Sequence, residues 1–204
     1  MSKKALIVLA IVAVAVLLPV GCGISTYNGL VSLDQQVQSQ WAQVENVYQR
    51  RLDLVPNLVE TVKGAAAFEK DTFTAVTEAR SRVAQASQAV APGGRAPDDP
   101  GALQKYQQAQ EQLSGALSRL MVVVERYPDL KATQNFRDLQ AQLEGTENRI
   151  AVERMRFNEA AQKFNTQRNT FPTVLFASFF GSRFQEKGYF RAEPGAEQAP
   201  KVKF

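Results

Sequence analysis

Apolar and small residues recur at steps of three and four from residue 26 to residue 170, and this spacing constrains the fold more than any other feature. Such a period places the apolar side chains on one stripe of each helix, and the stripe must be buried against other helices. The faces between the stripes are rich in Gln, Glu, Arg and Asn. The pattern predicts an all-α fold, an antiparallel up-and-down helical bundle with neighbouring helices inclined at about 20°.

Segments that contain proline divide this stretch into four expected helices, near residues 26–52, 54–91, 100–126 and 131–170. The assignment depends on Pro56. In the interpretation that we favour, a tight hairpin ends the first helix and Asp53 caps a second helix that begins at Leu54. If Pro56 only kinks a longer helix, the bundle has three long helices instead. With four helices, the last one returns to the end of the bundle at which the first begins.

An uncharged, apolar N-terminal segment precedes the bundle. Ala5–Leu18 is an unbroken run of 14 apolar residues, and no charge occurs from Ala5 to Leu33. Residues 1–25 are therefore predicted to be a membrane anchor or a lipoprotein-type signal. Lys3 and Lys4 precede the run, which places the N-terminus in the cytoplasm and the bundle on the extracytoplasmic side of the cell membrane.

Cys22 leaves a second form of the anchor open. The stretch from Leu18 to Cys22 resembles a bacterial lipoprotein cleavage box, although Pro19 stands where an aliphatic residue is usual. Cleavage before Cys22 would give a lipid-anchored chain with the same domain, whereas a retained segment would be a single-pass transmembrane helix. We favour the retained segment, and either form tethers the bundle to a membrane.

The composition excludes several kinds of chemistry. The chain has no histidine and one cysteine, which removes histidine-based catalysis and the common zinc and redox sites. The net charge is +4, and the two lysines at the N-terminus supply half of it, so a basic surface for nucleic acid is not expected. Glu144 and Glu147 share a helix face, but carboxylates in this pattern are usually solvated. We therefore expect no catalytic site, no metal and no cofactor.

Two polar clusters interrupt the helical pattern and are candidate interaction surfaces or structural contacts. Gly145 lies in mid-helix within the second cluster, where glycine costs about 1 kcal/mol relative to alanine and suggests a close approach of helices or a break in the helix. We favour a structural role for both clusters. Their candidate residues are Arg50, Arg51, Asp53, Asn57 and Glu60 in the first, and Glu144, Glu147, Asn148 and Arg149 in the second.

The C-terminal part of the chain contains an aromatic segment. Five of the 12 phenylalanines lie in residues 171–184, and no charge occurs before Arg183. Two interpretations remain open: an interfacial helix or partner-docking plug that uses Phe176, Phe179 and Phe180, and a short helix that caps the bundle core. Residues 26–184 form the expected bundle domain, and residues 185–204 are expected to be a disordered tail.

These residues resemble the LemA family of bacterial membrane proteins over nearly the whole chain. The resemblance rests on long blocks, Tyr48–Gly64, Glu125–Lys131 and Leu143–Ile150, together with Phe171-Pro172. It implies an anchored helical bundle that faces away from the cytoplasm, and it implies no reaction. By this resemblance alone, an HtpX-type membrane protease is a candidate partner, and membrane protein quality control is a candidate process.

The sequence thus predicts a non-enzymatic, membrane-anchored interaction protein of the bacterial cell envelope, with a membrane protein as its partner. The alternative is a structural protein that assembles at the membrane surface and forms homo-oligomers, because long amphipathic helices and the aromatic segment would suit that role as well.

Overall fold

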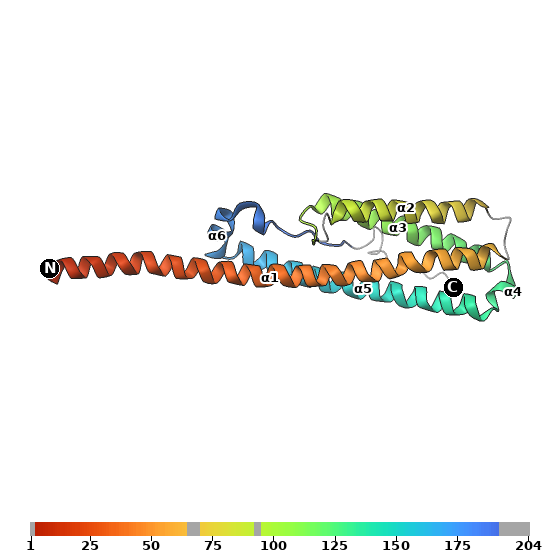
Figure 1. The fold of residues 1–204 in the computed structure, drawn as a ribbon, viewed down its shortest axis with the longest axis horizontal. Coiled ribbons are helices and arrows are strands. Elements are labelled where there is room, and N and C mark those ends of the chain that lie inside the picture. The colour runs from red at the N-terminus through yellow and green to blue at the C-terminus, as the bar shows by residue number, and fades with distance from the viewer. Residues whose placement is uncertain (1–2, 65–69, 92–94, 192–204) are drawn as a thin grey trace, which may run out of the picture.

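The computed structural model describes residues 3–64, 70–91 and 95–191, which form a rod of helices drawn out along one axis (Figure 1). Within these ranges there are helices and no strands, so the predicted all-α class is confirmed. The four long helices are α1 (Lys3–Lys63), α2 (Lys70–Val90), α3 (Pro100–Val124) and α5 (Gln134–Asn169). The short ones are α4 (Pro128–Lys131), α6 (Thr173–Phe179) and the 3-10 helix η1 (Gly181–Phe184).

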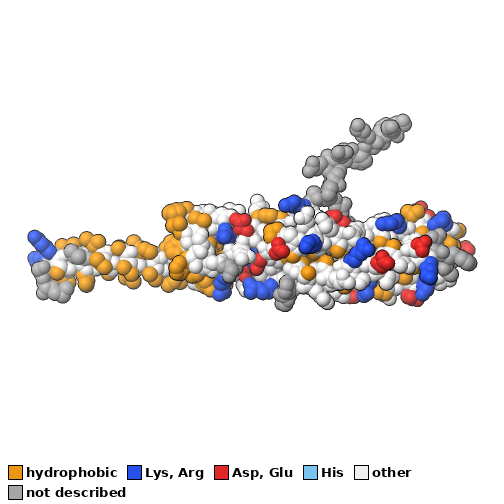
Figure 2. All heavy atoms as spheres, turned by 90° about the horizontal axis from the view of Figure 1, so that it is seen from above, with side chains coloured by type: hydrophobic (Ala, Val, Ile, Leu, Met, Phe, Trp, Pro, Cys, Tyr) orange, Lys and Arg blue, Asp and Glu red, His pale blue; other side chains and the backbone are white. Residues whose placement is uncertain are grey.

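The N-terminal part of α1 stands clear of the bundle, as a bare helix that leads into it (Figure 1). Its apolar side chains are exposed, Leu17 and Leu18 each to 68%. By length and composition, this helix could cross a membrane. Hydrophobic atoms cover this part of the helix from the lysine at its tip to the start of the bundle (Figure 2). Burial begins at Leu30, so the expected division between anchor and bundle falls inside one continuous helix.

Two pairs of helices make up the bundle. α1 packs along α5, and α2 packs along α3 (Figure 1). On α1, the buried positions alternate at steps of four and three, which keeps one stripe turned to the core over more than four seven-residue repeats. The positions of this stripe are Leu30, Asp34, Val37, Trp41, Val44, Tyr48, Arg51, Val55, Leu58 and Val62, and Leu52 beside it is buried as well.

The expected hairpin at Pro56 is wrong, because α1 continues through this residue to Lys63. Pro56 has no N–H with which to bond the carbonyl of Leu52, four residues earlier. Arg80 of α2 supplies the missing donor, since its Nε donates to the Leu52 oxygen at 3.2 Å. The predicted cap at Asp53 therefore also fails. The chain turns after Gly64 instead, and the bundle still has four long helices rather than the three expected if Pro56 lay within a longer helix.

The return of the fourth long helix is as the four-helix prediction requires. Asp99 caps α3 by accepting a hydrogen bond from the Gly101 N–H at 2.8 Å, with Pro100 at the first helical position. α3 runs to the far end of the rod, and α5 runs back toward the exposed part of α1 (Figure 1). α6 consequently lies beside α1 where the bundle begins. We call this end of the bundle proximal and the end with the α1–α2 turn distal.

The tail does not begin at residue 185 as expected. Residues 185–191, which we call the C-terminal segment, follow η1 without helix or strand and pack on the bundle. Lys187 and Phe190 are 2% and 5% exposed. Composition alone missed this because the segment is anchored by a few specific contacts rather than by an apolar stripe. The rest of the expected tail, residues 192–204, lies outside the described residues.

Candidate functional site

The first candidate site is the junction between α1 and α6. An apolar cleft of about 810 Å³ separates the two helices there. Hydrophobic atoms gather over this junction and continue along the bare part of α1, whereas Lys, Arg, Asp and Glu are scattered over the rest of the visible face (Figure 2). The cleft is lined by Pro19, Val20, Gly23, Ile24 and Tyr27 of α1, and by Leu175, Phe176, Phe179 and Phe180 of the aromatic segment.

The three candidate phenylalanines all lie at this junction but are placed differently. Phe179 is 86% exposed, and Phe176 and Phe180 are partly buried against α1. Gly23 permits the close approach of Phe176, because a Cβ at residue 23 would lie 3.1 Å from Phe176 Cε1. Leu175 precedes Phe179 by one helical turn and is 63% exposed. The segment therefore caps the bundle with one face and presents an apolar face outward with the other.

Tyr27 fixes the segment to α1. Its ring meets Phe180 edge-on at 4.9 Å between centroids and meets Phe184 at 5.6 Å. The Arg183 guanidinium lies 5.2 Å from the centre of the Tyr27 ring, within the range of cation–π attraction. A polar-tipped aromatic residue and an arginine beside an apolar surface are typical of a membrane interface.

Arg51 brings the two predicted polar clusters together inside the distal half of the bundle. This residue of α1 is 2% exposed, and its Nη2 lies 2.9 Å from Glu147 Oε1 of α5. Its guanidinium also donates to Ser114 and, at 3.3 Å, to Gln110 of α3. One side chain thus links three long helices, which supports the structural interpretation of these two residues.

The other residues of the two clusters point outward and form no single site. All seven are exposed: Arg50, Asp53, Asn57, Glu60, Glu144, Asn148 and Arg149. Asp53 accepts a hydrogen bond from Gln49, and Glu144 accepts one from Gln140, each within a single helix. Gly145 is also exposed with open space around it, so it marks no close helix contact, and α5 continues through it without a break.

Two buried tyrosines lie close enough to the Arg51 guanidinium to interact with it electrostatically. Tyr48 and Tyr106 meet edge-on at 5.3 Å, and each is 2% exposed. Burial raises the pKa of Tyr48 to about 12, against the opposing effect of Arg154 and Arg51. Burial also raises the pKa of Tyr106, and the neighbouring Tyr48 adds to the effect. Burial lowers the pKa of Arg51, whereas Glu147 raises it. The hydroxyls stay neutral at physiological pH, which suits packing rather than proton transfer.

Lys187 of the C-terminal segment forms a second buried network, in the proximal half, which sequence reasoning missed. Its ammonium is fully buried and lies 2.9 Å from Asp34 Oδ1 of α1. It also pairs with Asp98, in the loop before α3, and lies 5.1 Å from the centre of the Phe164 ring. Asp34 could have indicated this network from the sequence, because it occupies a core position of the α1 stripe and a buried carboxylate there needs a cationic partner.

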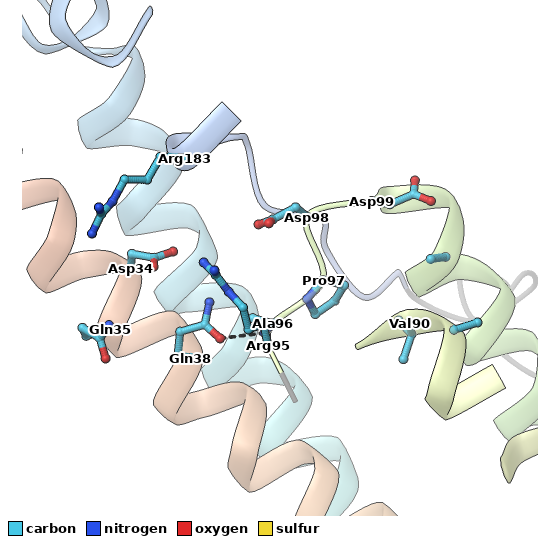
Figure 3. Close-up of a pocket in the computed structure, with 12 residues that line it drawn as sticks. Asp34, Gln35, Gln38, Val90, Arg95, Ala96, Pro97, Asp98, Asp99 and Arg183 are labelled. Carbon is cyan, nitrogen blue, oxygen red and sulfur yellow. Dashed lines mark hydrogen bonds between the residues drawn. The ribbon is translucent and has the colours of Figure 1, made fainter. Parts of the chain in front are cut away.

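The two aspartates also border an open cavity of about 830 Å³ between α1, the end of α2 and the loop of residues 95–99. Asp34 and Asp98 reach it from opposite sides, and Gln38 accepts a hydrogen bond from the Ala96 N–H at 2.7 Å (Figure 3). Among the described residues, no group of three or more Asp, Glu or Cys is placed to hold a metal ion. The cavity is a mixed polar groove, and Lys187 already pairs with both of its aspartates.

Cys22, the candidate lipidation site, is an exposed free thiol on the bare part of α1. It lies between Val20 and Gly23, two of the α1 residues that line the α1–α6 cleft.

The comparison with known proteins agrees with this architecture. The sequence model of the LemA family matches residues 40–204. The chain belongs to the LemA family. The match includes both buried networks in full except for Asp34 and includes the whole aromatic segment.

Curated relatives extend the picture. Magnetosome protein MamQ of Magnetospirillum gryphiswaldense and magnetosome protein MamQ 1 of Paramagnetospirillum magneticum are each 27% identical to this LemA-family chain over 183 residues. The alignment covers 84% of this chain and 66% of each relative, which is just under two thirds of their length. Family and relatives point to a membrane-associated helical protein, consistent with the apolar part of α1.

Proposed function

We propose that this LemA-family protein is a non-enzymatic, membrane-anchored interaction protein that receives a membrane-spanning helix of a partner in the α1–α6 cleft. The carrying observation is the position of the cleft. It lies where the apolar part of α1 enters the bundle, and its walls are apolar on both sides. A groove at this level meets helices that run inside the bilayer, and close packing against glycine and aromatic rings is a usual mode of association there.

The anchor in this proposal is the retained α1 helix, with the N-terminus in the cytoplasm and the bundle outside. Lys3 and Lys4 at the tip support this orientation by the positive-inside rule. Lipidation of Cys22 is the alternative. Intact mass spectrometry of the protein from its native membrane distinguishes the two forms, because a lipoprotein would begin at Cys22 and carry acyl mass. The residue ranges 1–25 and 26–184 remain our proposed division into anchor and domain.

The partner that we propose is a membrane protein of the bacterial envelope. An HtpX-type protease and a role in membrane protein quality control are suggested only by the family. From the relatives named for magnetosomes, the proposal takes membrane association and nothing more specific.

A second function is favoured by one observation. Phe171, Leu175 and Phe179 are 76%, 63% and 86% exposed and lie at the proximal end of the bundle. These side chains would suit insertion into the interface of the bilayer itself, as in a protein that assembles on the membrane surface.

Photocrosslinking in cells separates the two. A photoreactive residue replaces Phe179, and the matched control replaces Val122, an exposed apolar residue of α3 near the distal end. Recurrent capture of one membrane protein at residue 179 and not at residue 122 is the expected result. Lipid adducts or self-adducts alone at residue 179 would replace the interaction proposal by the membrane-surface one.

A further inference from the structure

The C-terminal segment is held on the bundle as a peptide ligand is held in a groove. Three side-chain amides each pair with both the N–H and the carbonyl of one backbone residue. Asn165 pairs with Lys187 at 2.9 Å in both directions, and Asn158 pairs with Phe190 at 2.8 and 2.9 Å. Gln107 of α3 pairs with Arg191 at 2.9 and 3.1 Å. A carboxamide used in this way takes the place of a neighbouring strand and recognises main chain.

The two asparagines are spaced to read an extended chain. Asn158 and Asn165 lie seven residues apart on α5, which is about 10.5 Å along a helix. Lys187 and Phe190, the residues that they hold, lie three residues apart, which is about 10 Å along an extended chain. The spacing of the two asparagines along α5 therefore matches the spacing of Lys187 and Phe190 along the segment, and both amides can bond the segment's main chain at the same time.

Side-chain pockets add sequence selectivity to the backbone contacts. Lys187 enters the acidic pocket formed by Asp34 and Asp98. Gly188 crosses close to α3, where a Cβ would lie 3.3 Å from both Leu103 and Pro100. Tyr189 is 44% exposed, and its hydroxyl accepts a hydrogen bond from Asn165 at 2.9 Å, so its position is less selective than those of Lys187 and Phe190.

Phe190 fills an aromatic pocket. Its ring stacks with Trp41 at 6.2 Å and 13°, and meets Phe157 edge-on at 5.5 Å. The Arg154 guanidinium lies 5.0 Å from the ring centre. The groove is thus complementary to the sequence Lys-Gly-x-Phe in an extended conformation.

We propose that this groove is a peptide-recognition site for an extended Lys-Gly-x-Phe sequence. The chain's own C-terminal segment fills it in the structure, and the same segment of a second copy can replace that segment by exchange. A second copy carries the identical sequence and satisfies every contact described above. No helix follows the segment within the described residues, so its exchange between copies does not require any described helix to change places. Anchoring in one membrane raises the local concentration of the exchanging copies. The groove lies away from the α1–α6 cleft, and the inference goes beyond the proposed function.

A peptide-binding measurement on the full chain in detergent micelles tests the groove. The receptor carries Lys187→Ala with Phe190→Ala, which disables its own segment and changes no residue of the groove. The ligand is a fluorescent peptide, Phe-Gln-Glu-Lys-Gly-Tyr-Phe-Arg, the sequence of residues 184–191. We expect binding at least about tenfold tighter than to the wild-type chain, whose groove is filled. The emission of Trp41, the only tryptophan, should shift as the peptide phenylalanine stacks on it.

Matched controls isolate the recognition. A peptide with the Lys187→Glu change, or a receptor that also carries Asn158→Ala and Asn165→Ala, should lose at least about tenfold in affinity. If the receptor with Lys187→Ala and Phe190→Ala does not fold, a receptor with the single change Lys187→Gln takes its place, and the same outcomes are expected. Equal binding to the wild-type and segment-disabled chains, or equal binding of the two peptides, would overturn the proposal.

Complementation tests the exchange between copies. One tagged copy has the disabled segment, and the other has the disabled groove, Asn158→Ala with Asn165→Ala. Only the mixed pair combines an intact groove with an intact segment. We expect the mixed pair to co-purify and each variant alone to stay unpaired. If the two variants together co-purify no better than either variant with itself, the proposed exchange of the segment between copies is wrong. Since the α1–α6 cleft is unchanged in every variant, either failure leaves the proposed function standing.

Discussion

The two halves of the bundle each bury one cation, but they hold it in different ways. In the distal half, Arg51 belongs to a long helix and has one carboxylate partner, Glu147, whose side chain is 41% exposed. In the proximal half, Lys187 comes from the C-terminal segment and has two carboxylate partners, of which Asp34 is 12% exposed. The distal network forms as soon as the helices pack. The proximal network is complete only after the C-terminal segment has docked.

The difference also sets the cost of losing each cation. A carboxylate that can reach water tolerates the loss of its partner, whereas one that is buried does not. The proximal half should therefore depend more strongly on its single lysine than the distal half depends on its arginine.

Loss of the lysine should have the largest effect. Lys187→Met leaves Asp34 buried without a cation, and we expect the free energy of unfolding to fall by about 3–5 kcal/mol. Urea unfolding in detergent, followed by Trp41 fluorescence, measures it. Lys163→Met removes an exposed lysine of α5 and should change stability by no more than about 0.5 kcal/mol. A loss below about 1 kcal/mol would remove the distinction between the two halves.

Arg51→Met should have a smaller effect, a loss of about 2–3 kcal/mol, because Glu147 can be hydrated while Ser114 and Gln110 are neutral. The neighbouring Arg50 is exposed, so Arg50→Met is the matched control and should be near neutral. The same urea titration measures both variants. If Arg51→Met proves more damaging than Lys187→Met, the order inferred from the exposure of the carboxylates is wrong.

Alkaline pH should weaken the distal half through Tyr48. Its pKa is raised to about 12 in the folded protein and is about 10 when unfolded. The folded state then binds the proton more tightly, so its contribution is present below pH 10 and is lost as the pH rises from 10 to 12. We expect Tyr48 to account for about 1–1.5 kcal/mol of lost stability at pH 11. Thermal unfolding at pH 8 and pH 11 measures it. A Tyr48→Phe variant that declines as steeply as the wild type would refute the assignment.

The smallest expected effect concerns the proline in α1. Arg80→Met removes the donor to the Leu52 carbonyl and should cost about 1 kcal/mol. In a Pro56→Ala background, the alanine N–H can bond that carbonyl, so the same change should cost almost nothing. A double-mutant cycle of unfolding free energies gives the coupling directly. Equal costs in both backgrounds would show that the arginine does not compensate for the proline.

The course of α1 was within reach of sequence reasoning. The buried stripe keeps its steps of four and three through Arg51, Val55, Leu58 and Val62, so the register passes Pro56 without a break. The incorrect prediction of a hairpin rested on the tendency of proline to break helices, whereas the uninterrupted period of the stripe predicts the observed helix. The same register places Asp34 and Arg51 at core positions and indicates that each has a buried partner.

The partners of Asp34 and Arg51 could not be predicted from the sequence. Arg51 and Glu147 were both in the predicted polar clusters, yet nothing in their spacing showed that they meet. Lys187 lies in a short segment without periodicity. The position of this segment depends on amides of α5 and α3 and on a carboxylate of the loop before α3. Such a segment has no stripe of its own, so local patterns do not predict where it docks.

In the membrane-anchored arrangement that we propose, the unbroken course of α1 makes the bundle a rigid arm that pivots about the bilayer-spanning part of this helix. The helix has 61 residues and no interruption between its apolar part and its distal end. The stretch after Ile24 is about 60 Å long at 1.5 Å per residue. A change of about 10° in the tilt of the anchor, well within the range that bilayer thickness imposes, would move the α1–α2 turn sideways by about 10 Å. Local bilayer thickness would then set the reach of the distal turn.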